Sequence, residues 1–253
     1  MAGTTASAGK YLYAVVQAAK DERDYGEIGI DGKRVYLISD NHVAAVVSDF
    51  SLGKIRPERR HIAAHQAVLK RLMQDEAPLP ISFGVIAAGV KDIRRILSLN
   101  RKAFVKQTQR VHGKVEMGVR VSWDVPNIFE YFVNTHPDLR VARDELIGGP
   151  RAPSQEDKME LGRLFDRYLQ GDREELTAKV EKSLACCSLE IKANPPRSEK
   201  EVMNLACLVG RQSVEKDFET AVCAAAQEFD NNFTFDFNGP WAPHNFVDVD
   251  LVL

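Results

Sequence analysis

The apolar positions of this chain recur every second residue in some segments and about every 3.6 residues in others, which predicts a mixture of strands and helices. Strands are expected where β-branched and aromatic residues alternate or cluster: YLYAVVQ from Tyr11, VAAVVSDF from Val43, PLPISFGVIA from Pro78, VEMGVRVSW from Val115, CCSLEIKAN from Cys186, VMNLACLVG from Val202 and NFTFDFNG from Asn232. Asp31-Gly32 also offers a hairpin turn between two short strands.

Helices are expected where the apolar period lengthens. One begins near Pro57, and Ile62, Leu69 and Met73 form an apolar stripe along it. The other helices are predicted from Val90 to Arg110, from Pro126 through Lys182 with a break at Gly148–Ser154, and from Ser213 to Asp230.

The order of these elements predicts the fold class. The second half runs β-α-β-β-α-β, the split βαβ or ferredoxin-like arrangement, which gives an antiparallel sheet with helices on one face. The first half fits a similar scheme with an extra hairpin and an incomplete ending. We therefore predict an α+β protein of two lobes, each a modified ferredoxin-like arrangement.

The expected parts are a disordered lead-in at 1–10, an N-terminal domain at 11–112, and a C-terminal domain at 113–253 with an extended tail at 239–253. One continuous domain is the alternative, because no flexible linker divides the halves.

Composition narrows the class of protein. The 253 residues are 44% hydrophobic and 28% charged with a formal net charge of −2, an ordinary balance for a soluble globular protein. That balance favours neither a nucleic-acid-binding protein overall nor a polyanionic tail. No apolar run approaches the roughly 20 residues that a membrane span needs. The start, MAGTTASAGK, lacks the apolar core of a secretory signal, so we expect a cytoplasmic protein.

His61 and His65 are the main candidates for chemistry, because four residues on a helix is a metal-ligand spacing. A metal-dependent enzyme would need a third ligand and an acid or base, and HIAAH lacks the glutamate of an HExxH motif. Both histidines fall within the apolar arc, so we interpret them as buried structural side chains. No phosphate loop, dinucleotide-binding glycine motif or nucleophile elbow occurs, and the four cysteines lack zinc-type spacing. We predict no enzyme, cofactor or metal, with the metal-dependent enzyme as a minor alternative.

Two segments could instead contact a partner. A basic run along residues 91–114 includes Arg94, Arg101 and Lys102 and would form a positive helix face. A nucleic-acid-binding module using this helix is the alternative function, and a solvated helix with salt bridges is the simpler interpretation. The ending FNGPWAPHNFVDVDLVL contains Trp241 and Phe246, which either pack back onto the protein or anchor a partner. We expect Trp241 to pack back.

Five segments occur together in one order between Tyr11 and Val247: YLYAVV, PLPISFGVI, EMGVRV, NLACLVG and GPWAPHNFV. In combination they resemble the GvpL/GvpF family of gas vesicle proteins. Two features depart from the family pattern. Met117 in EMGVRV stands where many relatives have an aromatic residue, and the loop around Gly149 is of variable type.

The resemblance implies an accessory or minor structural protein of the gas vesicle, the hollow protein shell that gives aquatic microbes buoyancy. It implies assistance in vesicle assembly and binding to the small hydrophobic shell protein GvpA, with some members on the gas-facing side. The implied partners are GvpA and other gas vesicle accessory proteins, without nucleic acid, and the implied location is the vesicle, with the cytoplasm before assembly. Two α+β lobes without an active site are also implied. The candidate partner-binding residues are Trp241, Phe246, Arg94, Arg101 and Lys102.

Overall fold

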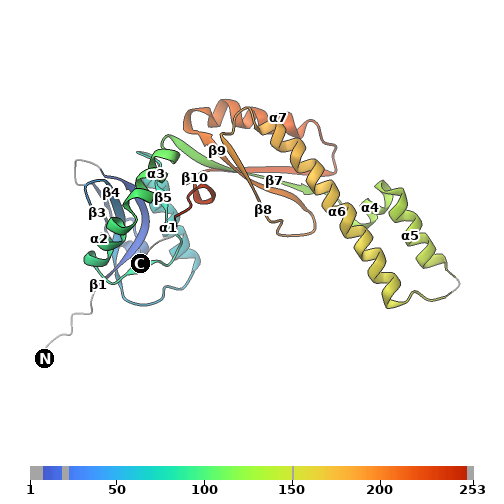
Figure 1. Ribbon diagram of the computed structural model, residues 1–253, viewed down its shortest axis with the longest axis horizontal. Helices are drawn as coiled ribbons and strands as arrows, with labels where there is room; N and C mark the ends of the chain where they lie inside the picture. The colour runs from blue at the N-terminus through green and yellow to red at the C-terminus, as the bar shows by residue number, and fades with distance from the viewer. Residues whose placement is uncertain (1–7, 19–22, 150, 250–253) are drawn as a thin grey trace. The chain divides into compact units, whose positions relative to one another are not determined.

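The computed structural model describes residues 8–18, 23–149 and 151–249, and the chain divides into two compact units (Figure 1). The first unit comprises residues 1–116 and 240–253, and the second comprises residues 117–239. This division differs from the predicted boundary at 112/113, and it groups the tail with the first unit instead of the second. The predicted disordered lead-in lies outside the described residues as far as residue 7, whereas Ala8 to Lys10 already belong to the first strand.

The first unit is built on a sheet that has six strands among the described residues. The strands are β1 (Ala8–Gln17), β2 (Asp24–Gly26), β3 (Val35–Ser39), β4 (Val43–Ser51), β5 (Leu79–Pro80) and β6 (Ile86–Ala87). Their order is β2-β3-β4-β1-β5, and β6 also pairs with β1. The neighbours run antiparallel, and the long central pair places Leu12 of β1 opposite Val47 of β4.

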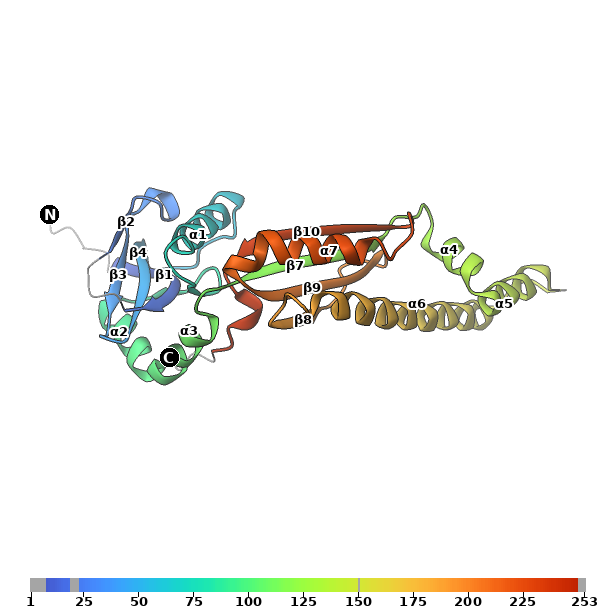
Figure 2. The same ribbon diagram turned by 90° about the horizontal axis from the view of Figure 1, so that it is seen from above.

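Helices cover both faces of this sheet (Figure 2). They are α1 (Arg59–Leu72), α2 (Val90–Leu99) and α3 (Arg101–Val111). Successive side chains of a strand point to opposite faces, so Tyr11 and Tyr13 lie on one face of β1 and Leu12 on the other. On the tyrosine face, His65 of α1 contacts both rings. On the opposite face, Leu12 shares a core cluster with Phe104 of α3. The one-sided cover expected for the second half therefore does not describe this unit. The two-sided cover explains why β1 and β4 contain continuous runs of buried residues.

Two predicted elements are each divided in the structure. PLPISFGVIA, expected as one strand, forms only the short strands β5 and β6. Between them Gly84 has a φ of +93°, outside the strand region, and its N–H donates to the Tyr11 hydroxyl. The helix expected from Val90 to Arg110 breaks at Asn100. Asn100 is buried, and its side-chain amide donates to the Ile96 carbonyl at 2.9 Å, which satisfies the end of α2.

Among its described residues, the second unit contains a four-stranded sheet and a set of helices. Its elements are β7 (Lys114–Trp123), α4 (Ile128–Thr135), α5 (Pro137–Gly148), α6 (Gln155–Leu184), β8 (Glu190–Asn194), β9 (Glu201–Gly210), α7 (Glu219–Ala226) and β10 (Phe233–Trp241), with a π-helical turn at Val214–Phe218. The strand order is β10-β7-β9-β8, and α6 packs beside α7 and against β9 (Figure 1).

The class predicted from the sequence, helices with antiparallel sheet, is confirmed. The chain order of strands and helices in the second half also matches the predicted β-α-β-β-α-β order. The finer ferredoxin-like description of each lobe stays a prediction. Within the described ranges, none of the helices combines the length and apolar character that crossing a membrane requires.

Candidate functional site

His65 lies inside the first unit in a closed network of hydrogen bonds. It is 2% exposed, and its Nδ1 is 2.9 Å from the Tyr11 hydroxyl oxygen. That oxygen accepts the N–H of Gly84 at 3.1 Å, so its own proton is available for Nδ1. The Ile81 carbonyl accepts a further hydrogen bond from the ring. A neutral imidazole has one donor and one acceptor nitrogen, so these contacts specify the tautomer protonated at Nε2.

Burial determines the charge of this network. It lowers the pKa of His65 to about 4, an effect that nearby His244 strengthens and the Ile81 carbonyl opposes. Burial also raises the pKa of Tyr11 to about 12 and lowers the pKa of His244. All three side chains are therefore uncharged at neutral pH. The network therefore connects α1, β1 and the segment before β6 in the interior of the first unit.

His61 binds other parts of the first unit. Its Nδ1 is 3.1 Å from the carbonyl oxygen of Arg56, and its Nε2 is 3.4 Å from a carboxylate oxygen of Asp31. The two histidines, one helical turn apart, thus contact different segments: His65 reaches Ile81, and His61 reaches Arg56 and Asp31. These contacts agree with the interpretation of both as buried structural side chains. Among the described residues, no group of three His, Cys, Asp or Glu side chains is placed to hold a metal ion.

The basic run is divided between α2, α3 and the start of β7. Arg101 pairs with Asp40 at 3.0 Å, and Arg110 donates to the Phe246 carbonyl at 3.0 Å. Lys114, expected on a helix, begins β7 and donates to the Arg110 carbonyl at 2.6 Å. The exposed cations outside these bonds are Lys91, Arg94, Arg95, Lys102 and Lys106. Within the described basic run, the solvent-facing charge that is not already paired with Asp40 or bonded to a carbonyl is this smaller set.

The tail places its two candidate aromatic residues in different environments. Trp241, expected to pack back, is 44% exposed at the end of β10. Phe246, a candidate partner anchor, is completely buried in the first unit. The adjacent Asn245 donates its backbone N–H and its side-chain amide to the Glu116 carboxylate, at 2.8 and 2.7 Å. A partner can therefore reach the Trp241 side chain but not that of Phe246.

Strand β10 offers an apolar sheet edge, because it is an outer strand of the second sheet. Phe233, Phe235 and Phe237 share one face of it, as the sequence predicts. Phe229 covers the first two, with ring centroids 5.1 and 5.0 Å away, whereas Phe237 is 41% exposed. The opposite edge, β8, has the charged sequence EIKAN, and charges on an edge strand disfavour pairing with another chain.

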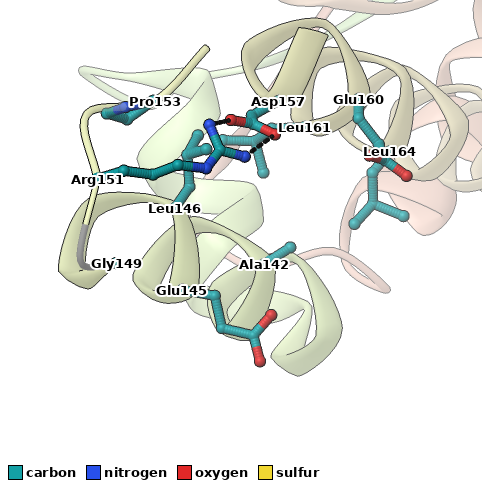
Figure 3. A pocket seen from close by; sticks show the side chains of 10 residues that line it. All are labelled: Ala142, Glu145, Leu146, Gly149, Arg151, Pro153, Asp157, Glu160, Leu161 and Leu164. Atoms are coloured by element: carbon teal, nitrogen blue, oxygen red, sulfur yellow. Dashed lines mark hydrogen bonds and ion pairs between the residues drawn. The ribbon is translucent and has the colours of Figure 1, made fainter.

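A groove with a volume of about 580 Å³ lies between α5 and α6 (Figure 3). Its apolar lining includes Ala142, Leu146, Leu161 and Leu164. Near the turn that joins the helices, Arg151 binds Asp157 at 2.7 Å, and the lining also contains the acids Glu145 and Glu160. Sequence reasoning treated this region as a helix break and missed the groove. The spacing of Leu161 and Leu164 is the signal that could have indicated an apolar face there.

Known proteins resemble this chain along nearly its whole length. A family model described as gas vesicle synthesis protein GvpL/GvpF matches residues 9–248. Gas vesicle protein F of Nostoc sp. strain PCC 7120 is 24% identical over 246 residues, which cover 96% of this chain and 99% of the relative. Gas vesicle protein F of Dolichospermum flosaquae is 25% identical over 246 residues, or 95% and 98% of the two chains. The crystal structure of GvpF from Anabaena sp. PCC7120 has the same fold, with a TM-score of 0.82 at 24% identity over 96% of this chain and 100% of that one.

Proposed function

Because the chain belongs to the GvpL/GvpF family of gas vesicle synthesis proteins, we propose that it binds the hydrophobic shell protein GvpA and assists vesicle assembly. The observation that carries the proposal is the family match, which runs through residues 9–248 and so includes both units. Association with the gas vesicle follows from the family. The shell protein as the direct partner and the role in assembly are the proposed steps, and neither involves catalysis.

The physical basis is the protection of an apolar surface. A shell subunit with a large apolar face aggregates in water unless that face is covered before assembly. Strand β10 can provide cover by accepting a partner strand at its outer edge, where main-chain hydrogen bonds supply affinity and side chains supply specificity. The exposed ring of Phe237 supplies the apolar contact. Pro240 has no N–H, so pairing is limited to the part of β10 before it.

The exposed cations of α2 and α3 have a secondary role in this proposal. Arg94 and Lys102 face solvent, where charges are screened over about 8 Å at physiological ionic strength. Such charges speed the encounter with an acidic surface and orient it, and they add little affinity. A nucleic acid is the alternative partner for the same cations. Filter binding at low and moderate salt would detect it, because phosphate contacts weaken steeply with salt.

Co-purification with co-expressed shell protein tests the proposed contact. Phe237→Lys places a charge at the apolar edge and should reduce recovery of the shell protein about tenfold, the loss expected for a contact worth roughly 1–2 kcal/mol. Leu189→Lys is the matched control, since Leu189 is 65% exposed in the same unit but lies outside β10. Equal recovery with both variants would remove β10 from the proposal. Complete absence of shell protein with the unaltered chain would remove the proposed partner itself.

Flotation of vesicles tests the proposed location. A chain that stays with the wall should remain on vesicles that have been floated and washed. An assembly factor that is released would be found in the cytoplasmic fraction and on growing vesicles only. Either distribution is compatible with binding to the shell protein, whereas absence from all vesicle fractions contradicts it.

A further inference from the structure

The hairpin of α5 and α6 buries little of its own apolar surface. Among the described residues of α6, none before Leu169 is buried, and in α5 only Leu139 is buried. Leu146, Leu161 and Leu164 line the groove and are only half-buried. Helices of folded proteins usually cover such a stripe with another element. The groove is therefore an apolar surface with space for a further helix beside it.

Among the described residues that line the groove, the charges without an ion-pair partner are negative. Glu145 on α5 and Glu160 on α6 are exposed, and neither forms an ion pair within the described part of the chain. Among the described lining residues the one cation is Arg151, whose two terminal nitrogens bind the Asp157 carboxylate at 2.7 and 3.1 Å. Asp157 therefore neutralises the charge of Arg151. The two glutamates, one on each helix, are the charges left to meet a partner (Figure 3).

We propose that this groove binds an amphipathic helix of a partner protein whose apolar stripe is flanked by Lys or Arg. Apolar side chains at positions i, i+3, i+4 and i+7 would lie on the leucines, and the flanking cations would meet Glu145 and Glu160. The charge pairing selects a basic helix over an acidic one.

This site is separate from the contact proposed at β10. The groove residues belong to α5, to α6 and to the turn between them, and none of them is in the sheet. Phe237→Lys should therefore leave binding at the groove unchanged. Failure of the shell-protein proposal and failure of this one would be observed with different variants and different probes.

Peptide binding to the full-length chain tests the inference. The probe is a fluorescent peptide of about 18 residues, roughly five helical turns, with leucines on one face and lysines elsewhere. Its counterpart carries glutamates in place of the lysines. The double variant Glu145→Lys/Glu160→Lys should weaken binding of the lysine peptide about tenfold, as expected when two modest attractions become repulsions. The control Glu174→Lys/Glu175→Lys makes the same charge change at exposed positions of α6 outside the groove and should change affinity less than about twofold.

Amide hydrogen exchange locates the bound peptide, and protection is expected in α5 and in residues 155–168 of α6. The inference is overturned if the lysine peptide does not bind, if the glutamate peptide binds as tightly, or if both double variants weaken binding equally. It is also overturned if light scattering shows that the unaltered chain is a dimer and that the Glu145→Lys/Glu160→Lys variant is a monomer. That result would make a second copy of this chain the occupant.

Discussion

Acidification should destabilise the first unit through His65. The folded protein holds this ring neutral, because burial lowers its pKa to about 4. The unfolded chain binds a proton at His65 with the ordinary pKa of about 6.5. Between these values the unfolded state binds more protons than the folded state, so stability is full above pH 6.5 and falls as the pH drops toward 4. His244, whose pKa burial also lowers, acts in the same direction.

The size of the effect follows from the two pKa values. A separation of about 2.5 pKa units corresponds to about 3 kcal/mol once the pH is well below 4. At pH 5.0 the calculated loss relative to pH 7.5 is about 2 kcal/mol. The ring is 2% exposed, so screening by solvent does not reduce this figure much. Such a loss is a large fraction of the stability of an ordinary domain.

His65→Gln separates this effect from the titration of other groups. Glutamine keeps an amide donor and an acceptor but cannot become charged in this pH range. The variant should be less stable at pH 7.5, because the ring contacts with Tyr11, Tyr13 and Phe83 are lost. Its further loss between pH 7.5 and 5.0 should be about 2 kcal/mol smaller than that of the unaltered chain.

Amide exchange in β1 and β4, measured in urea at both pH values, reports the first unit alone. His42→Gln is the matched control, because His42 is exposed in the same unit. It should keep the full acid sensitivity. If His65→Gln loses as much stability on acidification as the unaltered chain, the buried neutral ring is not the cause and the reasoning fails.

Two further predictions concern the tail and the helix pair. Phe246→Ala should lower the free energy of unfolding, measured by urea titration, by about 3–5 kcal/mol, because it leaves a cavity at a fully buried site. Trp241→Ala removes an exposed ring and should lower the free energy of unfolding much less. Equal losses would contradict the placement of the tail. Ser154→Ala should destabilise α6 by about 1 kcal/mol, because the Ser154 hydroxyl accepts the Asp157 N–H at 3.2 Å in a reciprocal capping box. Amide hydrogen exchange should become faster in the first turns of α6 and stay unchanged in β9. Faster exchange in both would contradict an effect confined to the helix start.

Strands with long buried runs were well predicted, because apolar residues follow one another there almost without interruption. YLYAVV, VAAVV and NLACLVG each lie within a sheet strand. PLPISFGVIA alternates equally well, yet only its ends pair with β1. Its middle instead forms a loop in which the Gly84 N–H donates to the Tyr11 hydroxyl. Tyr11 lies 73 positions before Gly84 in the chain, so no local sequence pattern indicates this hydrogen bond or the loop that it stabilises.

The interaction surfaces were predicted less well. Trp241 and Phe246 lie in the same Pro-rich stretch, and their local sequence gives no reason for one to be buried and the other exposed. The hydrogen bonds of Asn245 with Glu116, 129 residues earlier, decide it. No local pattern distinguishes the five exposed cations from Arg101 and Arg110 either. In the structure Arg101 binds Asp40, and Arg110 donates to the Phe246 carbonyl.

The order of apolar patterns along the chain determined the mixed α+β class and the internal position of the two histidines. These depend on the period of hydrophobic residues, which is a local property of the sequence. Only the tertiary structure decided that the first sheet is covered on both faces, that the tail packs with the first unit, and that a groove with acidic residues on both helices lies between α5 and α6. Each of these depends on which distant surfaces bury the most apolar area and satisfy each other's hydrogen bonds, and a local pattern carries no information about that choice.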